Sequence, residues 1–256
     1  MKKAFCIFLS LAMMLSIGTA SLAHDRNTAY NWYCKNNDDH TLPTLDGSFQ
    51  FIKKYDAFYA NEKATDEKVI YLTFDAGYEN GNVAKVLDAL DAHGAKGAFF
   101  ILDNLIKRDG ELVKRMSDGG HTVCNHTAKH HDMTKITDKG QFKKELSSLS
   151  DAYFALTGRD MAPFYRPPEG KFSEQNLSFA KELGYKTVFW SFAYADWDND
   201  KQPDPEKAFQ KIMDHTHNGA VILLHPTSAT NAAIMDRLLT EWERQGYRFG
   251  TLDELC

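Results

Sequence analysis

Residues 69–90 read VIYLTFDAGYENGNVAKVLDAL, and two different hydrophobic periods follow one another within them. The first six residues are an uninterrupted run of β-prone side chains, which predicts a fully buried strand. The apolar residues after the glycines recur with the period of one helix face, at Val83, Val86, Leu87 and Leu90. A buried strand followed by an amphipathic helix is typical of a parallel sheet covered by helices.

The same alternation continues along the rest of the chain. Six further apolar runs predict strands at residues 98–102, 122–125, 164–166, 187–191, 220–224 and 247–250. Residues with a helical period separate most of these runs, for example Leu146, Leu149 and Tyr153. Seven strands that alternate with helices predict either an open doubly wound sheet or a closed barrel.

Polar side chains with chemical potential follow five of the predicted strands, and they favour the barrel. These residues are Asp75, His126, Arg166, Asp196 and His225. In an open sheet the five strand ends would spread along a line, whereas in a barrel they converge on one face. We therefore expect an α/β barrel, with a single catalytic domain over residues 65–256.

The first 64 residues precede this pattern. Lys2 and Lys3 stand before an apolar run over residues 4–17, and Ser21-Leu22-Ala23 matches a cleavage site, so residues 1–23 read as a secretory signal peptide. The alternative is a retained membrane anchor, for which the apolar run is short. Residues 24–64 are expected to wrap the barrel as an irregular extension. We thus predict a secreted protein without a stable membrane span.

The composition excludes two classes of protein. With 43% hydrophobic, 12% aromatic and 25% charged residues, the chain is too apolar and too evenly charged to be disordered. Its formal net charge of -5 argues against nucleic acid as a partner, because neutralising phosphates requires a basic surface. We expect a monomer.

Three cysteines remain after the predicted cleavage: Cys34, Cys124 and Cys256. An odd number cannot form a complete disulfide framework. Cys34 and Cys256 stand near the two chain ends, so they could form one bridge, or all three could be free thiols. Cys124 lies in an apolar run and is expected to pack as a small hydrophobe.

His126 and His130 are candidate metal ligands. On a helical turn, imidazoles four residues apart lie on one face and can share a metal. Solvated histidines are the simpler interpretation, and His131 could replace His130. The position just after a strand favours a site.

Each of the other four segments also has a plain structural interpretation. Asp75 could cap the next helix, and residues 166–170 (RPPEG) could be a stiff turn that positions an arginine. The aromatic and acidic residues 190–197 suit either a sugar-binding rim or the core. His225, at the end of a strand, could be a satisfied core histidine.

Together and in this order, the five segments resemble the motifs of the polysaccharide deacetylase family, carbohydrate esterase family 4. That family has T-F-D-D-G, H-[ST]-x-x-[HD], R-x-P-x-G, an aspartate followed by tryptophan, and L-x-H. Here the corresponding residues are 73–77, 126–130, 166–170, 196–197 and 223–225. The resemblance implies a distorted (β/α)7-type barrel. Residues 78–81 (YENG), the Arg-Pro-Pro block and residues 32–43 look most like the muramic δ-lactam-forming deacetylases of spore formers.

The resemblance implies a metal and a base. His126 and His130 would hold a divalent metal, usually zinc, which polarises the acetamide carbonyl and activates water. Asp75 would be the general base, and Arg166 would orient it and keep it ionised.

It also implies the remaining groups of the site. His225 would protonate the leaving amine, and Asp196 would orient that imidazole. The metal and the backbone N–H of Glu169 would stabilise the oxyanion. Leu223 and Trp197 would form an apolar slot for the acetyl methyl group.

Two positions depart from the family pattern. The second aspartate of the first motif, a metal ligand in most of the family, is Ala76, so metal binding is expected to be weak. Glu169 stands where an aromatic residue or an arginine is common elsewhere, but its backbone role survives the change.

These implications predict a secreted, extracytoplasmic enzyme of the cell wall or the spore cortex, whose partner is the peptidoglycan glycan strand. It would hydrolyse the acetamide of N-acetylmuramic acid residues, and the freed amine would then close a muramic δ-lactam. Two alternatives remain: an N-acetylglucosamine deacetylase acting on peptidoglycan or chitin-type chains, and a catalytically silent glycan-binding homologue that lost its metal at Ala76.

Overall fold

A computed structural model describes residues 25–35 and 37–255. The predicted signal peptide and Cys256 lie outside the described residues. Within residues 25–35 and 37–255, no helix is both long and apolar enough to cross a membrane.

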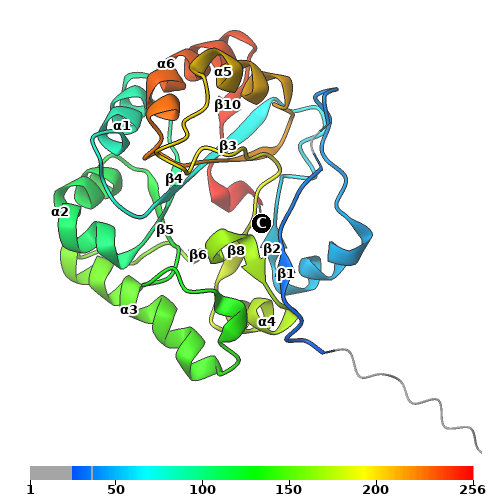
Figure 1. Cartoon of the computed structure of the whole chain (residues 1–256), viewed down its shortest axis with the longest axis vertical. Coiled ribbons are helices and arrows are strands. Elements are labelled where there is room, and N and C mark those ends of the chain that lie inside the picture. Colours follow the sequence, from blue (N-terminus) through cyan, green and yellow to red (C-terminus); the bar gives the residue numbers. More distant parts are fainter. Residues whose placement is uncertain (1–24, 36, 256) are drawn as a thin grey trace, which may run out of the picture.

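The predicted barrel is confirmed. Seven parallel strands follow one another along a curled sheet in the order β10-β3-β4-β5-β6-β8-β2, and β9 pairs with β3 (Figure 1). A parallel bridge between Phe192 and Ile222 links the segment after β8 to β9. The strands of this sheet are β2 (Ala57–Phe58), β3 (Val69–Ala76), β4 (Ala98–Ile101), β5 (Thr122–Asn125), β6 (Phe164–Tyr165), β8 (Lys186–Val188), β9 (Ala220–Leu224) and β10 (Arg248–Phe249).

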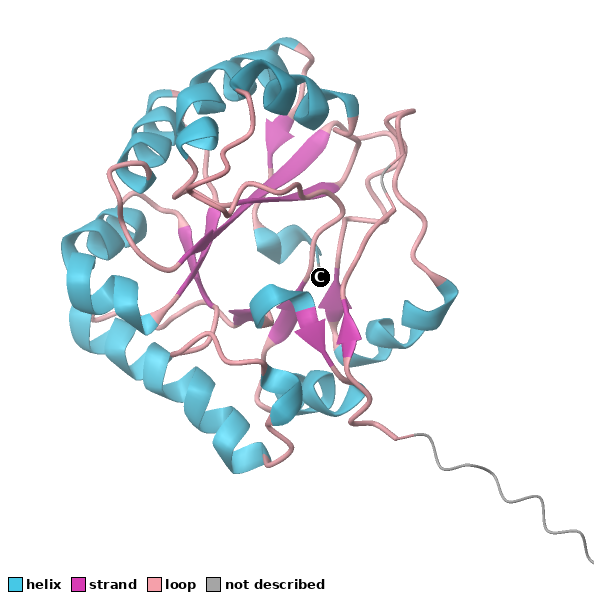
Figure 2. Ribbon diagram, viewed as in Figure 1, coloured by secondary structure: helices cyan, strands magenta, loops and turns pink. Residues whose placement is uncertain are grey.

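The described residues contain six α-helices, and Figure 2 shows helices around the strands. They are α1 (Val83–Ala92), α2 (Asp103–Asp118), α3 (Lys139–Thr157), α4 (Glu174–Glu182), α5 (Pro205–Asp214) and α6 (Ala229–Arg244). Four of these helices have a side-chain N-cap that accepts a hydrogen bond from a backbone N–H of the first turn. The capping residues are Asp138, Ser173, Asp204 and Ser228. The predicted alternation of strand and helix is therefore present throughout.

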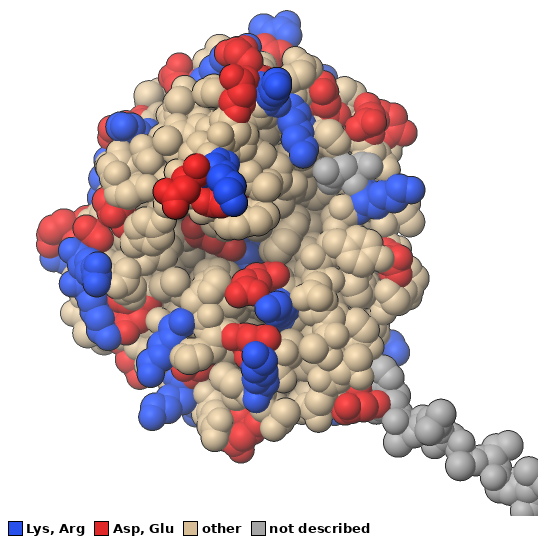
Figure 3. Space-filling view, viewed as in Figure 1, with Lys and Arg blue, Asp and Glu red and all other residues tan. Residues whose placement is uncertain are grey.

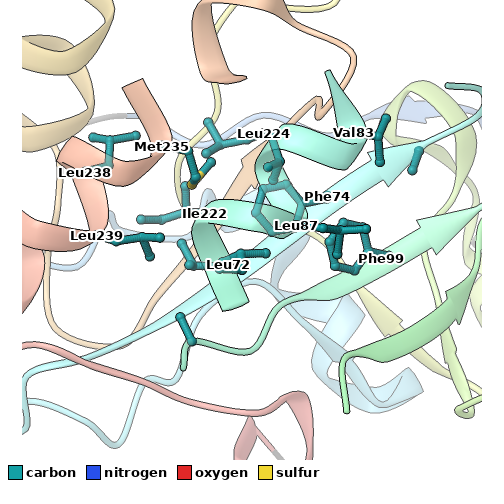
Figure 4. Close-up of a cluster of buried hydrophobic side chains, with 14 of the residues drawn as sticks. Leu72, Phe74, Val83, Leu87, Phe99, Ile222, Leu224, Met235, Leu238 and Leu239 are labelled. Atoms are coloured by element: carbon teal, nitrogen blue, oxygen red, sulfur yellow. The ribbon is translucent and has the colours of Figure 1, made fainter. Parts of the chain in front are cut away.

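β3 shows how the strand period sorts side chains. Ile70, Leu72 and Phe74 belong to the large apolar cluster beneath the helices, where they pack with side chains of α1 and α6 (Figure 4). Val69 and Tyr71 belong to a second cluster, which also contains Cys124 and, from the 3-10 helix η4 (Leu252–Leu255), Leu252 and Leu255. Because side chains alternate along a strand, Asp75 falls on the face of Tyr71 and Ala76 on the face of Phe74.

The N-terminal extension is more ordered than expected. β1 (Tyr30–Asn31) pairs with β7 (Lys171–Phe172), the 3-10 helix η1 spans Gly47–Tyr55, and β2 joins the main sheet beside β8. Its aromatic residues cover the barrel at one place, where the rings of Trp32 and Phe189 stack with centroids 4.3 Å apart.

Two expectations about strands and cysteines can now be compared with the structure. β8 covers residues 186–188 rather than 187–191, and beyond it Ser191 N–H donates to the carbonyl oxygen of Val221 on β9. Cys124 is buried in an apolar cluster as predicted; Cys34 is half-buried and has no disulfide partner among the described residues, which do not include Cys256.

Candidate active site

The five motif segments converge on one pocket at the carboxyl ends of the strands. Its volume is about 840 Å³, and Figure 3 shows one face of the molecule hollowed near its centre between acidic and basic side chains. All but two of the sequence-predicted site residues line this pocket: Asp75, His126, His130, Glu169, Trp197, Leu223 and His225. The other two, Arg166 and Asp196, are buried behind it.

Arg166 holds Asp75 in place. Arg166 Nη1 donates to Asp75 Oδ1 at 2.8 Å, and Nη2 donates to Thr73 Oγ1 at 2.8 Å. Arg166 Nε donates to the carbonyl of Val188, and the guanidinium lies 4.1 Å from the ring centre of Phe100. These hydrogen bonds and the ring contact fix the position of the fully buried Arg166 guanidinium. It is therefore a rigid support for the Asp75 carboxylate.

The charge of Arg166 also sets the protonation of Asp75. Burial would raise the pKa of Asp75, but the Arg166 guanidinium, acting together with His126 and His225, more than offsets it and holds that pKa below its ordinary value. Asp75 is thus ionised at neutral pH, and its Oδ2 lies 3.5 Å from His126 Nε2.

His126 presents one ring nitrogen to the pocket. Its Nδ1 lies 2.9 Å from the carbonyl oxygen of Arg166, so Nδ1 carries the proton and Nε2 keeps its lone pair. Burial lowers the pKa of His126 to about 4, which keeps the ring neutral at physiological pH.

The expectation of a helical turn at residues 126–130 is wrong. Thr127 and His130 have φ angles of 72° and 57°, and this left-handed loop brings the rings of His126 and His130 to 5.0 Å. The loop is stabilised by His130 N–H, which donates to Thr127 Oγ1. His131 is exposed and does not line the pocket.

Asp196 and His225 form the second polar pair. His225 Nδ1 lies 2.7 Å from Asp196 Oδ1, and His225 N–H donates to Asp196 Oδ2 at 2.8 Å. Burial works against a charged His225 ring, but the hydrogen bond and charge of Asp196 raise the pKa of His225 above its ordinary value. Because Asp196 occupies Nδ1, Nε2 is the nitrogen left for a ligand in the pocket.

The rim contains one strained residue and several aromatic ones. Glu169 has φ of 56°, lines the pocket and pairs through Oε2 with Lys171 Nζ at 2.6 Å. Trp197 is 61% exposed, and its ring centre lies 6.2 Å from that of His225. Tyr78 and Trp190 also line the pocket; the sequence predicted no site role for Tyr78 and gave Trp190 only as part of the aromatic segment 190–197.

Comparison with known proteins decides the family. The polysaccharide deacetylase profile matches residues 62–188. The chain is 40% identical to the peptidoglycan-N-acetylmuramic acid deacetylase PdaA of Bacillus subtilis, and the match covers 99% of this chain and 95% of that protein. This chain belongs to the polysaccharide deacetylase family.

Other proteins similar to this chain support the same family assignment. The solved structure of Bacillus subtilis PdaA, described as a family 4 carbohydrate esterase, matches with a TM-score of 0.85 at 41% identity, over 90% of this chain and 97% of that chain. A family 4 carbohydrate esterase from Bacillus anthracis matches with a TM-score of 0.73 at 34% identity, over 90% and 96%. The peptidoglycan-N-acetylglucosamine deacetylase PgdA of Listeria monocytogenes is 34% identical over 75% of this chain and 40% of its own length. The chain is therefore a hydrolase of carbon–nitrogen bonds other than peptide bonds.

Polysaccharide deacetylases are generally metal-dependent, so the donor set matters. His126 and His130 offer two neutral imidazoles, but Ala76 is fully buried within the apolar cluster beneath the helices. Among the described residues, no group of three or more His, Cys, Asp or Glu side chains is arranged to hold a metal ion. A catalytic zinc site usually has three protein ligands, so these side chains supply an incomplete set, from which only weak binding is expected.

Proposed function

We propose that this chain is a secreted peptidoglycan N-deacetylase that hydrolyses the acetamide of N-acetylmuramic acid residues. The observation that carries the proposal is the 40% identity to PdaA over nearly the whole of both chains. The pocket geometry supports this proposal, because the ionised carboxylate of Asp75 and the protonatable imidazole of His225 line the same cavity. They come from the first and the fifth motif.

Asp75 is the proposed general base. A water molecule beside its free Oδ2 loses a proton to the carboxylate as the water oxygen attacks the acetamide carbon. Arg166 keeps Asp75 ionised and fixes its position through the 2.8 Å hydrogen bond. The tetrahedral oxyanion would be stabilised by the backbone N–H of Glu169, a residue that lines the pocket with φ of 56°.

His225 is the proposed general acid. Its Nε2 delivers a proton to the amide nitrogen as the carbon–nitrogen bond breaks, so that acetate and a free amino sugar leave. Asp196 holds the ring through Nδ1 and stabilises the charged form. Leu223 and Trp197 supply the apolar surface for the acetyl methyl group.

A divalent cation, for which we propose zinc, would bind weakly to His126 and His130. Both rings are favoured in the neutral, ligating form by burial. No step above depends on it.

The product suits the spore cortex. The freed amine of a muramic residue stands next to its lactyl carboxyl group, and their condensation gives a muramic δ-lactam. An N-acetylglucosamine deacetylase is the second candidate, which the 34% identity to PgdA supports.

The test is acetate release from peptide-free peptidoglycan strands, with and without zinc, followed by mass analysis of the digested sugars. Loss of acetyl groups from muramic residues alone is the expected result. Loss from glucosamine residues would establish the second candidate. Strands that bind without any acetate release would show a glycan-binding protein instead.

A further inference from the structure

Asn231 lies directly behind the Asp196–His225 pair. It is fully buried in the first turn of α6, where its backbone N–H donates to Ser228 Oγ at 3.1 Å. None of the five motifs contains it, and its side chain does not line the pocket.

The Asn231 amide joins both members of the pair. Its Nδ2 donates to Asp196 Oδ2 at 2.7 Å and to the carbonyl oxygen of His225 at 3.0 Å. Asp196 Oδ2 also accepts the His225 backbone N–H, which leaves Oδ1 to the imidazole. One amide group therefore fixes the plane of the Asp196 carboxylate and the start of the loop after β9.

Tyr194 fixes which way the amide faces. Its hydroxyl donates to Asn231 Oδ1, and both residues are buried. A hydroxyl donor on Oδ1 requires the NH₂ group to face Asp196, so the amide cannot exchange its two ends without losing hydrogen bonds.

We infer that Asn231, oriented by Tyr194, is a positioning residue that holds the Asp196 carboxylate so that His225 Nε2 faces the substrate. The inference rests on the proposed function, in which His225 is the acid. Asn231 does not touch substrate; it acts through Asp196.

Asn231→Asp tests this role because it keeps the shape and replaces the donor by a carboxyl group. Two carboxyl groups in contact share one proton, so the new side chain can donate to Asp196 only while that proton is held. The other ionisable groups that act on His225 are Asp75 and Arg166, and both stay in place. The expected result is a kcat lower by about 10- to 100-fold near neutral pH, with little change in KM and partial recovery as pH falls.

Asn176→Asp is the matched control. Asn176 is also a buried asparagine in the first turn of a helix, its N–H donates to a serine cap at 3.1 Å, and its Nδ2 donates to the carbonyl of Ile136. Asn176 does not line the pocket, and its hydrogen bonds go to Ser173 and Ile136 rather than to the pair, so this variant should keep the kcat and the pH profile of the parent.

Tyr194→Phe removes only the hydroxyl that orients the amide and should lower kcat by a smaller factor. If the Asn231→Asp and Asn176→Asp proteins have the same kcat and pH profile, the inference is wrong. Should Asn231→Asp fail to fold, an unchanged kcat in Tyr194→Phe overturns it equally. Absence of acetate release from the unaltered protein would instead overturn the proposed function, so the two failures are distinguishable.

Discussion

Asp75 combines burial, charge and a single strong partner, so a change there should affect both chemistry and stability. Asp75→Asn removes the base, and acetate release should fall by at least about 10²-fold. It also leaves the Arg166 cation buried without its counter-charge, which should cost roughly 3–5 kcal/mol of unfolding free energy. Acetate release and urea unfolding measure the two effects. Asp103→Asn, in an exposed pair with Lys107, is the control, and unchanged turnover in Asp75→Asn would exclude the base role.

The pH profile should report the pair at His225. An acid must be protonated to act, so kcat should fall as pH rises through the raised pKa of His225. In Asp196→Asn the charge that raises this pKa is gone, and the basic limb should move to lower pH, with a lower maximum. Initial rates across the pH range test this. A basic limb that stays in place would show that a different group titrates.

Ala76 stands where most of the family has a metal-ligating aspartate, so the effect of that third ligand can be tested here. Ala76→Asp adds a carboxylate in an apolar environment, so without metal the variant should melt below the parent. If this carboxylate joins His126 and His130, zinc should raise its melting temperature more than that of the parent. Melting curves in chelator and in excess zinc make the comparison. Equal zinc shifts would contradict a third ligand at this position.

Prediction from sequence works best for residues at strand ends. Asp75 and His225 could be predicted as neighbours because each follows a strand of the same barrel. Asn231 could not, because its role depends on a contact between α6 and the loop after β8. The left-handed angle of Thr127 was equally hidden, because a β-branched residue rarely adopts it.

At the scale of elements, length explains part of what was predictable, although β6 and β10 were predicted with only two residues each. β3 and β9 bury side chains over eight and five residues, so their hydrophobic runs are visible in the sequence. β1, β2 and β7 have two residues each, too few to show a period. Tertiary contacts, rather than the strand propensity of their own residues, decide how these short strands pair.

The turn before β9 should depend on a glycine. Gly219 has φ of 76°, and a Cβ there would lie 2.3 Å from the carbonyl oxygen of Asn61 in the extension. Gly184 has φ of 84° and open space around it, so Gly184→Ala isolates the cost of the left-handed backbone, about 1–2 kcal/mol. Gly219→Ala should be clearly more destabilising in urea unfolding, because backbone must also move. If the two variants lose the same unfolding free energy, the backbone of the extension at Asn61 moves away from the new Cβ at no cost.

At the scale of the whole molecule, the extension forms part of the support of the pocket. Trp32 Nε1–H donates to the carbonyl of Trp190, and Trp32 N–H donates to the carbonyl of Gly170, next to Glu169. The extension thus reaches two residues of the pocket wall from behind. This link was not predictable, because residues 24–64 show no regular hydrophobic period.

Trp32→Ala should therefore weaken both the fold and the site. Losing a buried tryptophan that stacks on Phe189 should cost about 3–5 kcal/mol, and release of the Glu169 turn should raise KM for peptidoglycan strands at temperatures where the variant is still folded. Tyr33→Ala is the control, because Tyr33 is the next residue but 53% exposed. Urea unfolding and steady-state kinetics on the two variants separate the effects. A Trp32→Ala protein with lower stability but unchanged KM would show that the extension protects the barrel without shaping the pocket, since the Glu169 turn would then hold its conformation unaided.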